Sequence, residues 1–192
     1  MSSQETNQVF HEHKFALIII DMMNTLDFEG GDKLLERALP AAKNILKLKR
    51  KLKPMGIPVI YVNDNFGQWR SNWEEVFEIC SQDSCRGKEI ALMLKPEDDD
   101  YFVLKPKHSG FYSTTLEVLL DELKVETLIL TGVAGNICVL FTANDAHMRD
   151  YDVIVPRDCM ASNTQEDDDY TVRQLSQVFG INTPTVDTIN LS

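Results

Sequence analysis

Three residues of this chain are of types that together could carry out nucleophilic chemistry at a carbonyl carbon. Asp21, Lys105 and Cys138 each follow a short apolar run of strand length. A thiol can attack a carbonyl carbon, a carboxyl group can take and return the proton, and an ammonium stabilises negative charge. If the three runs are parallel strands of one α/β sheet, these side chains gather at its carboxyl edge, where such folds bind ligands.

Taken singly, each of these residues also has an ordinary structural interpretation. Asp21 could cap the following turn, Lys105 could be a solvated charge, and Cys138 could be a small buried hydrophobe. The catalytic hypothesis therefore rests on the combination of the three.

The segment around Cys138 supports a role for its thiol as a nucleophile. Residues 130–139 read as the end of a strand, a tight turn of small residues and a helix with Cys138 in its first turn. Unpaired N–H groups at a helix start favour an anion, which lowers the pKa of a cysteine and leaves donors for an oxyanion. A nearby Lys105 ammonium favours the thiolate further, and Asp21 can shuttle the proton. We therefore expect the pKa of the Cys138 thiol to lie below its ordinary value.

The elements that must position these residues alternate along the chain. Strands are expected at residues 15–20, 58–62, 102–104, 127–130 and 153–155, with a short edge strand near 185–189. Helices are expected at residues 34–52, 73–94, 114–123, 136–149 and 170–179. Near-continuous apolar strands separated by crossover helices indicate a parallel sheet covered on both faces.

This pattern predicts an α/β fold, a single-domain three-layer α/β/α sandwich with a mostly parallel, doubly wound sheet. The domain is expected to span residues 13–192. Residues 1–12 are polar and unpatterned, which predicts a flexible N-terminal arm.

The amino-acid composition indicates which kinds of binding partner are expected. With 43% hydrophobic residues in 192, the chain has enough apolar material for one core. Its 19 Lys and Arg against 30 Asp and Glu give a net charge of −11, which disfavours nucleic acid and anionic lipid surfaces. The longest apolar run is too short for a membrane span, and no leader pattern opens the chain. The expected partner is a small-molecule substrate, with no nucleic acid and no membrane.

The cysteines indicate a reducing compartment. The chain has four, at positions 80, 85, 138 and 159, and none forms a C-x-x-C pair. A disulfide scaffold and a zinc site are therefore not expected. Cys80 and Cys85 are interpreted as ordinary thiols, and the expected location is cytoplasmic.

Three blocks of the sequence carry a resemblance to a known family. They read IIIDMMN at residues 18–24, KPKHSGF at residues 105–111, and TGVAGNICV at residues 131–139 followed by Thr142 and Asp145-Ala146. With these blocks the chain resembles the isochorismatase-like superfamily of cysteine hydrolases, which includes nicotinamidases and N-carbamoylsarcosine amidases. The third block is the most specific.

The resemblance implies roles for particular residues. Asp21, Lys105 and Cys138 would form a catalytic triad, and the backbone N–H groups of Ala134 and Cys138 would form an oxyanion hole. A cis peptide bond would join Val133 to Ala134. The family's usual assembly also implies a homo-oligomer, a dimer or a tetramer.

The region after the second strand departs from the nicotinamidase pattern. Nicotinamidases hold a divalent ion there with an Asp-x-His sequence and further histidines, whereas this chain reads NDNF at residues 63–66 and has no histidine between His13 and His108. We therefore expect no metal and no cofactor, because Asp64 alone cannot bind zinc.

Five residues are candidates for contact with the substrate: Asn63, Asp64, Trp69, Arg70 and Phe111. A solvent-facing loop is an equally good interpretation of the first four, and Phe111 could belong to the core.

The predicted function is that of a metal-independent cysteine hydrolase that cleaves an amide-type C–N bond of a small molecule through a thioester. One alternative is an isochorismatase-type vinyl ether hydrolase, in which the aspartate acts as an acid and no thiol is needed. Another is a non-catalytic binding or scaffold protein on the same fold, since a fold alone does not fix a function.

Overall fold

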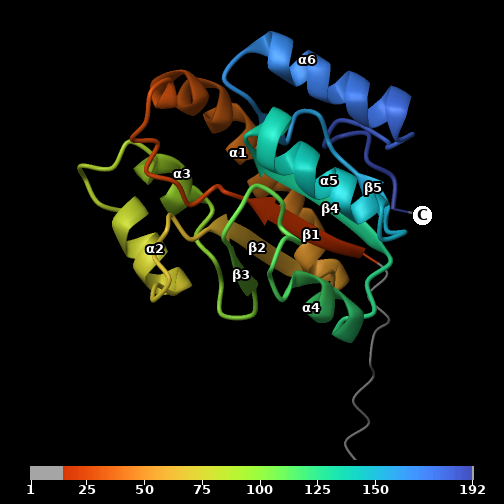
Figure 1. The fold of residues 1–192 in the computed structure, drawn as a ribbon, viewed down its shortest axis with the longest axis horizontal. Helices are drawn as coiled ribbons and strands as arrows, with labels where there is room; N and C mark the ends of the chain where they lie inside the picture. The colour runs from red at the N-terminus through yellow and green to blue at the C-terminus, as the bar shows by residue number, and fades with distance from the viewer. Residues whose placement is uncertain (1–14, 192) are drawn as a thin grey trace, which may run out of the picture.

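The computed structural model describes residues 15–191 as an α/β fold with helices on both faces of a parallel sheet (Figure 1). The predicted arm at residues 1–12 lies outside the described residues, as do positions 13, 14 and 192 of the predicted domain. Within the described residues no helix has the length and apolar character needed to cross a membrane.

The described strands form one six-stranded sheet in which every pairing is parallel. They are β1 (Phe15–Ile20), β2 (Val59–Asp64), β3 (Tyr101–Lys105), β4 (Thr127–Val133), β5 (Asp152–Ile154) and β6 (Met160–Ala161). The order is β3-β2-β1-β4-β5, and β6 pairs with β4 beyond the end of β5. The chain thus winds outward from β1 to β3 and then returns to β4 on the other side of β1. The carboxyl ends of β1 and β4 flank this switch point, where doubly wound sheets bind ligands.

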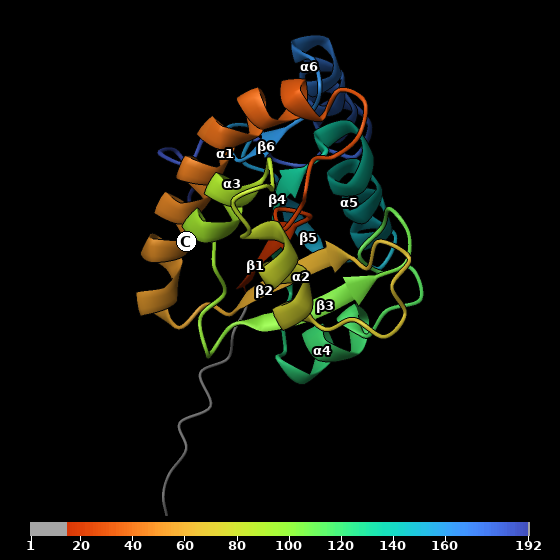
Figure 2. The ribbon, with the colours of Figure 1, turned by 90° about the vertical axis from the view of Figure 1, so that its left-hand side faces the viewer.

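The helices cover the two faces of the sheet. They are α1 (Gly31–Leu52), α2 (Trp73–Cys80), α3 (Lys88–Met93), α4 (Leu116–Glu122), α5 (Leu140–His147) and α6 (Gln165–Arg173). A 3₁₀ turn (Lys53–Met55) ends α1, and π-helical turns precede α5 (Gly135–Val139) and follow α6 (Gln174–Val178). Figure 2 shows α1 and α3 on one side of the strands and α4 and α5 on the other.

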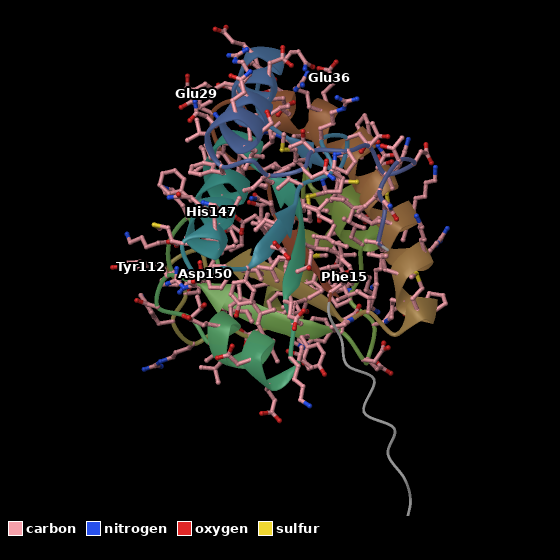
Figure 3. All side chains as sticks on the ribbon, turned by 90° about the vertical axis from the view of Figure 1, so that its right-hand side faces the viewer. Phe15, Glu29, Glu36, Tyr112, His147 and Asp150 are labelled. Atoms are coloured by element: carbon pink, nitrogen blue, oxygen red, sulfur yellow. The ribbon has the colours of Figure 1, made fainter. Side chains whose placement is uncertain are left out.

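The strands bury both of their faces, which explains their continuous apolar runs. In β1, Leu17 and Ile19 pack into a cluster with α1 and α3. Ile18 and Ile20 pack into a second cluster with α4 and α5. Successive side chains of a strand point to opposite faces, so one run of five buried residues serves two apolar layers. Glu29 and Glu36 are exposed and lie on the outside of the molecule, as Figure 3 shows.

The structure corrects two of the expected elements. The single helix expected over residues 73–94 is two helices, α2 and α3, with turns between them. Gly87 is the last residue before α3. Glycine is needed there because a Cβ would stand 1.8 Å from the carbonyl oxygen of Asn24. No strand forms at residues 185–189, where Thr188 N–H donates to the Thr185 carbonyl in a turn. The short strand β6 was not expected at all.

Candidate active site

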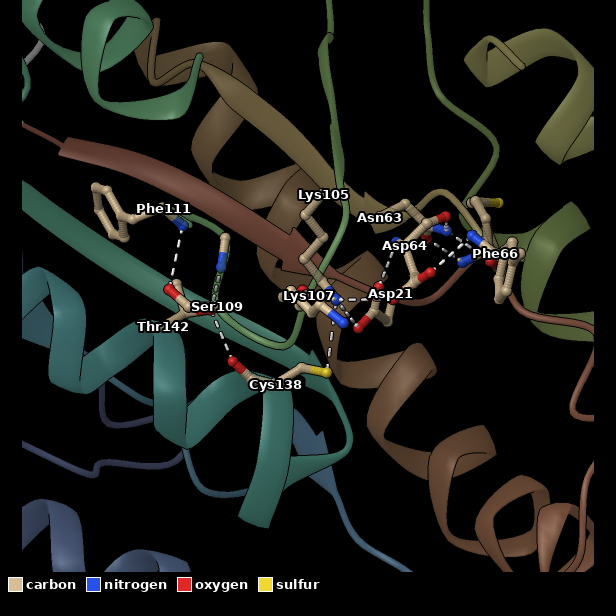
Figure 4. Close-up of polar contacts among 12 residues, drawn as sticks. Asp21, Asn63, Asp64, Phe66, Lys105, Lys107, Ser109, Phe111, Cys138 and Thr142 are labelled. Atoms are coloured by element: carbon tan, nitrogen blue, oxygen red, sulfur yellow. Dashed lines mark hydrogen bonds and ion pairs between the residues drawn. The ribbon is translucent and has the colours of Figure 1, made fainter. Parts of the chain in front are cut away.

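Asp21, Lys105 and Cys138 meet at the carboxyl edge of the sheet (Figure 4). The Lys105 Nζ lies 2.8 Å from Asp21 Oδ2 and 3.6 Å from Cys138 Sγ. The lysine is 0% exposed and the aspartate 5%. The ends of β1 and β3 and the turn after β4 therefore bring a carboxylate, an ammonium and a thiol together, with the ammonium in contact with both of the others.

Asp21 is held by the ends of two strands. Its backbone N–H donates to the Val62 carbonyl, and its Oδ1 accepts the Asp64 N–H at 2.7 Å. The residue has a φ of 52°, in the left-handed region that aspartate tolerates better than most residues. Its Oδ2 is left to contact Lys105, so the carboxyl group has a fixed orientation.

Lys105 is held by its own loop. Its Nζ donates to the Lys107 carbonyl at 3.0 Å, and its backbone carbonyl accepts the Asn65 N–H. An ammonium has three protons, and Asp21, the Lys107 carbonyl and the Cys138 sulfur offer one partner for each. The Asp64 carboxylate lies next, at 3.6 Å.

Cys138 lies in the π-helical turn that joins β4 to α5. The preceding peptide bond between Val133 and Ala134 is cis. Gly132 is required before it, with a φ of 117°, because a Cβ there would stand 2.0 Å from the Ile20 carbonyl oxygen. The Ala134 carbonyl accepts hydrogen bonds from the N–H groups of residues 137 and 139, so the turn is wider than an ordinary α-helical start.

The electrostatics at the sulfur differ from the expectation. Burial raises the pKa of the Cys138 thiol to about 12, the Asp21 carboxylate adds to the rise, and the Lys105 ammonium opposes it. The prediction of a lowered thiol pKa was wrong. It considered the Lys105 ammonium and the N–H groups of the turn, but not the burial of the sulfur or the negative charge of Asp21 beside the ammonium. The raised pKa favours the neutral thiol over the thiolate, and Asp21 and Lys105 are the charged groups that act on the sulfur.

The two charged partners are themselves perturbed. Burial raises the pKa of the Asp21 carboxyl, with Lys105 opposing the rise. Burial alone would lower the pKa of Lys105, but Asp21, Cys138 and Asp64 together raise it above its ordinary value. The ammonium is thus charged, and the carboxyl is a stronger base than a solvated aspartate.

Two of the five residues expected to contact the substrate are buried and have partners within the protein. Asn63 is buried, and its amide accepts the Met23 N–H and donates to the Met23 carbonyl, so it fastens the loop after β1. Phe111 is also buried, points away from the triad in Figure 4, and packs against Tyr151 and Arg149. Sequence places a residue near an edge of the sheet without showing where its side chain points, and contact of these two side chains with a substrate stays a prediction.

Of the other three, Asp64 lies beside Lys105, and Trp69 and Arg70 belong to the exposed segment between β2 and α2. Asp64 is one-third exposed and faces Lys105, with its Oδ1 also accepting the Phe66 N–H at 2.6 Å. Trp69 is 79% exposed, and Arg70 is exposed beside it. Their contact with a substrate stays a prediction.

The donors at this position do not fit the divalent ion of nicotinamidases. Asp64 already accepts one backbone N–H, and Phe66, two residues on, has no ligand atom. Within residues 15–191 no cluster of three or more His, Cys, Asp or Glu side chains is arranged to hold a metal.

Sequence reasoning named Ser109, Thr142 and Asp145 within its motif blocks but gave them no role in holding the loop after Lys105. Thr142 accepts the Gly110 N–H and donates to the Cys138 carbonyl. Ser109 donates to the Asp145 carboxylate. The signal was present in the spacing, since residue 142 stands one helical turn after residue 138.

A large cavity of the structure lies away from Asp21, Lys105 and Cys138. A cavity of about 510 Å³ lies between α1 and α6, and none of the three site residues lines it. Its Arg37 is already bonded to Asp168 and to the Ser162 carbonyl.

Comparison with known proteins identifies related chains. The Isochorismatase domain family model matches residues 15–187. The uncharacterised isochorismatase family protein YaaI of Bacillus subtilis is 43% identical over 164 residues, which cover 85% of this chain and 90% of that protein. The ureidoacrylate amidohydrolase RutB of Serratia proteamaculans is 28% identical over 176 residues, 78% of this chain and 70% of that protein. The crystal structure of N-carbamoylsarcosine amidase from Thermoplasma acidophilum has a TM-score of 0.70 and 26% identity, covering 92% of this chain and 99% of that one.

Proposed function

Because this chain belongs to the isochorismatase family of hydrolases, we propose that it is a metal-independent cysteine hydrolase that cleaves an amide-type C–N bond of a small molecule. Two of the relatives are named as amidohydrolase and amidase, which supports this bond type. The observation that carries the proposal is the Lys105 ammonium in contact with both the Asp21 carboxylate and the Cys138 sulfur.

The first half-reaction forms a thioester. Asp21 takes the thiol proton as Cys138 Sγ attacks the carbonyl carbon, and the carbonyl π electrons move to oxygen. When the tetrahedral intermediate collapses, the C–N bond breaks and the departing nitrogen takes the proton from Asp21. The raised pKa of Asp21 suits this exchange, because a stronger base takes a thiol proton more readily.

The second half-reaction releases the acid. Asp21 takes a proton from water as the water oxygen attacks the thioester carbon, and the C–S bond breaks on collapse. The sulfur then recovers its proton from Asp21, which restores the resting site. The products are an amine or ammonia and a carboxylic acid. Lys105 stabilises the sulfur while it carries negative charge.

The oxyanion of both intermediates is assigned to the backbone N–H groups of Ala134 and Cys138. The N–H groups of residues 136, 137 and 139 are engaged by Ser162 Oγ and by the Ala134 carbonyl. Preorganised backbone donors of this kind typically contribute about 10²–10³ in rate each.

An acid-quenched mass measurement tests the proposal. The protein is mixed with pooled small amides in the presence of a chelator, quenched, and its intact mass and Cys138 peptide are measured. We expect an acyl adduct on Cys138 that is absent from Cys138→Ala, and loss of turnover in Asp21→Asn. Cys85→Ala removes a half-buried thiol from another region and is expected to retain the adduct.

The same measurement identifies the alternatives. Turnover of a vinyl ether such as isochorismate that survives Cys138→Ala would contradict thiol catalysis. Binding of amides with neither adduct nor turnover would indicate a non-catalytic protein on this fold.

A further inference from the structure

The hydroxyl of Thr142 joins the two segments that carry Lys105 and Cys138. Thr142 is fully buried on α5, and its Oγ1 donates to the Cys138 carbonyl at 2.7 Å and accepts the Gly110 N–H at 3.0 Å (Figure 4). A hydroxyl has one proton to donate, so the donor is fully used.

The two partners belong to different parts of the chain. Cys138 lies one turn before Thr142 in the helical segment, whereas Gly110 lies in the loop after β3, five residues beyond Lys105. A second link joins the same two segments, because Ser109 Oγ donates to the Asp145 carboxylate on α5. The loop is thus fixed to the nucleophile helix at two successive residues.

This loop holds the Lys105 ammonium in place. It carries the Lys107 carbonyl, which accepts from Lys105 Nζ at 3.0 Å. The same Nζ lies 3.6 Å from the Cys138 sulfur, the longer of its contacts to the other two triad side chains. A displacement of the loop moves the Lys107 carbonyl, and the ammonium then follows its shorter contacts with Asp21 and the carbonyl.

We propose that Thr142 is a positioning residue whose hydroxyl fixes the loop carrying the Lys107 carbonyl, and thereby the contact between the Lys105 ammonium and the Cys138 sulfur. Its consequence for turnover rests on the proposed function, but the contact itself does not.

The charges around the sulfur make this contact measurable. Asp21 from the end of β1 and Lys105 from the end of β3 face the thiol, and Asp64 from the end of β2 faces the lysine. On α5, Asp145 faces Ser109 and Arg149 instead. Lys105 lowers the pKa of the thiol, whereas burial and Asp21 raise it. Weakening the lysine contact therefore leaves less thiolate at any given pH.

The test is the rate of Cys138 alkylation by iodoacetamide, followed by peptide mass spectrometry from about pH 7 to about pH 10, where thiolate alone reacts. Thr142→Val keeps the shape and removes the hydroxyl. We expect its rate to fall about tenfold for each unit by which the thiol pKa rises. Thr142→Ser restores the hydroxyl and is expected to restore the rate.

Thr171→Val is the matched control. Thr171 is equally buried and makes the same bond to the carbonyl four residues before it, that of Asp167, but on α6. Its loss is expected to leave the alkylation profile of Cys138 unchanged. Should Thr142→Val fail to fold, Ser109→Ala breaks the second link and is expected to slow alkylation in the same direction.

Two results would overturn the proposal: an unchanged or faster alkylation of Cys138 in folded Thr142→Val, or an equal fall in Thr171→Val. Once a substrate is known, kcat should fall in Thr142→Val while KM is retained. Failure to find any hydrolysed amide would count against the proposed function and leave the alkylation result standing.

Discussion

Burial and the adjacent Asp21–Lys105 pair together set the pKa of the Cys138 thiol. Since a full positive and a full negative charge stand beside the sulfur, their effects on the thiolate largely oppose each other, and burial decides the outcome. In the proposed reaction the thiol would therefore lose its proton during attack rather than before it. This arrangement protects the sulfur from electrophiles while no substrate is bound, because the thiolate is the reactive form.

Lys105→Met tests this pair through the pH dependence of stability. Removing the ammonium leaves the Asp21 carboxylate buried without an opposite charge, which typically costs about 3–5 kcal/mol. Burial already raises the pKa of Asp21 in the folded chain, and loss of Lys105 raises it further. The unfolded carboxyl ionises at lower pH, so the folded variant binds the extra proton and becomes relatively more stable as pH falls.

We therefore expect the loss in unfolding free energy to be large at about pH 8 and smaller at about pH 5, as measured by urea unfolding. Lys107→Met changes an exposed side chain two residues away and is expected to have little effect at either pH. A loss in Lys105→Met that does not depend on pH would contradict the buried-pair interpretation.

For single residues, the sequence predicted which side chains come into contact more accurately than it predicted their pKa values or the direction in which they point. The meeting of Asp21, Lys105 and Cys138 followed from their places after three parallel strands, a property of the chain order. The raised thiol pKa depends on burial and on the order of charges in space, which no spacing contains. The inward direction of Asn63 likewise depends on the loop after β1, which has no regular pattern.

Among the elements, α1 is tied to the sheet by a buried ion pair. Lys49 and Asp100 have side chains only 2% and 1% exposed, and Lys49 Nζ also donates to the Tyr61 hydroxyl at 3.1 Å. The pair joins the last turns of α1 to the loop before β3. It fixes the end of the sheet opposite to the candidate active site.

Lys49→Met is expected to destabilise the chain by about 3 kcal/mol, at the lower end for a broken buried pair because Lys53 still contacts Asp100. The measurement is the midpoint of urea unfolding. Lys47→Met removes an exposed pair with Asp187 from the same helix and should cost less than about 1 kcal/mol. Equal losses in the two variants would show that the buried pair has no special role.

The strands were more predictable than their connections. A buried strand such as β1 can be recognised in the sequence by its continuous apolar run. The strand predicted at residues 15–20 is the one observed. The two residues of β6 are too few for a pattern, and they pair only because β4 extends past the end of β5. The break between α2 and α3 depends on close contact of Gly87 with the chain at Asn24, which is a tertiary feature.

At the scale of the whole molecule, charge and apolar surface act in opposite directions on self-association. The chain carries a net charge of −11, so copies repel one another at neutral pH. Yet three apolar side chains along one helical segment are exposed: Ile137 in the π-helical turn (38%), Phe141 on α5 (50%) and Met148 just after α5 (63%). Association that covers apolar area gains free energy that salt does not weaken.

The dimer or tetramer implied by the family resemblance is therefore expected to be more stable at high ionic strength than at low, because salt screens only the repulsion. Sedimentation velocity at a fixed protein concentration across a salt series measures this as a rise in the oligomer fraction. A chain that stays monomeric throughout the series would contradict the predicted assembly. An oligomer that dissociates on adding salt would show instead that its contacts are mainly ion pairs between copies.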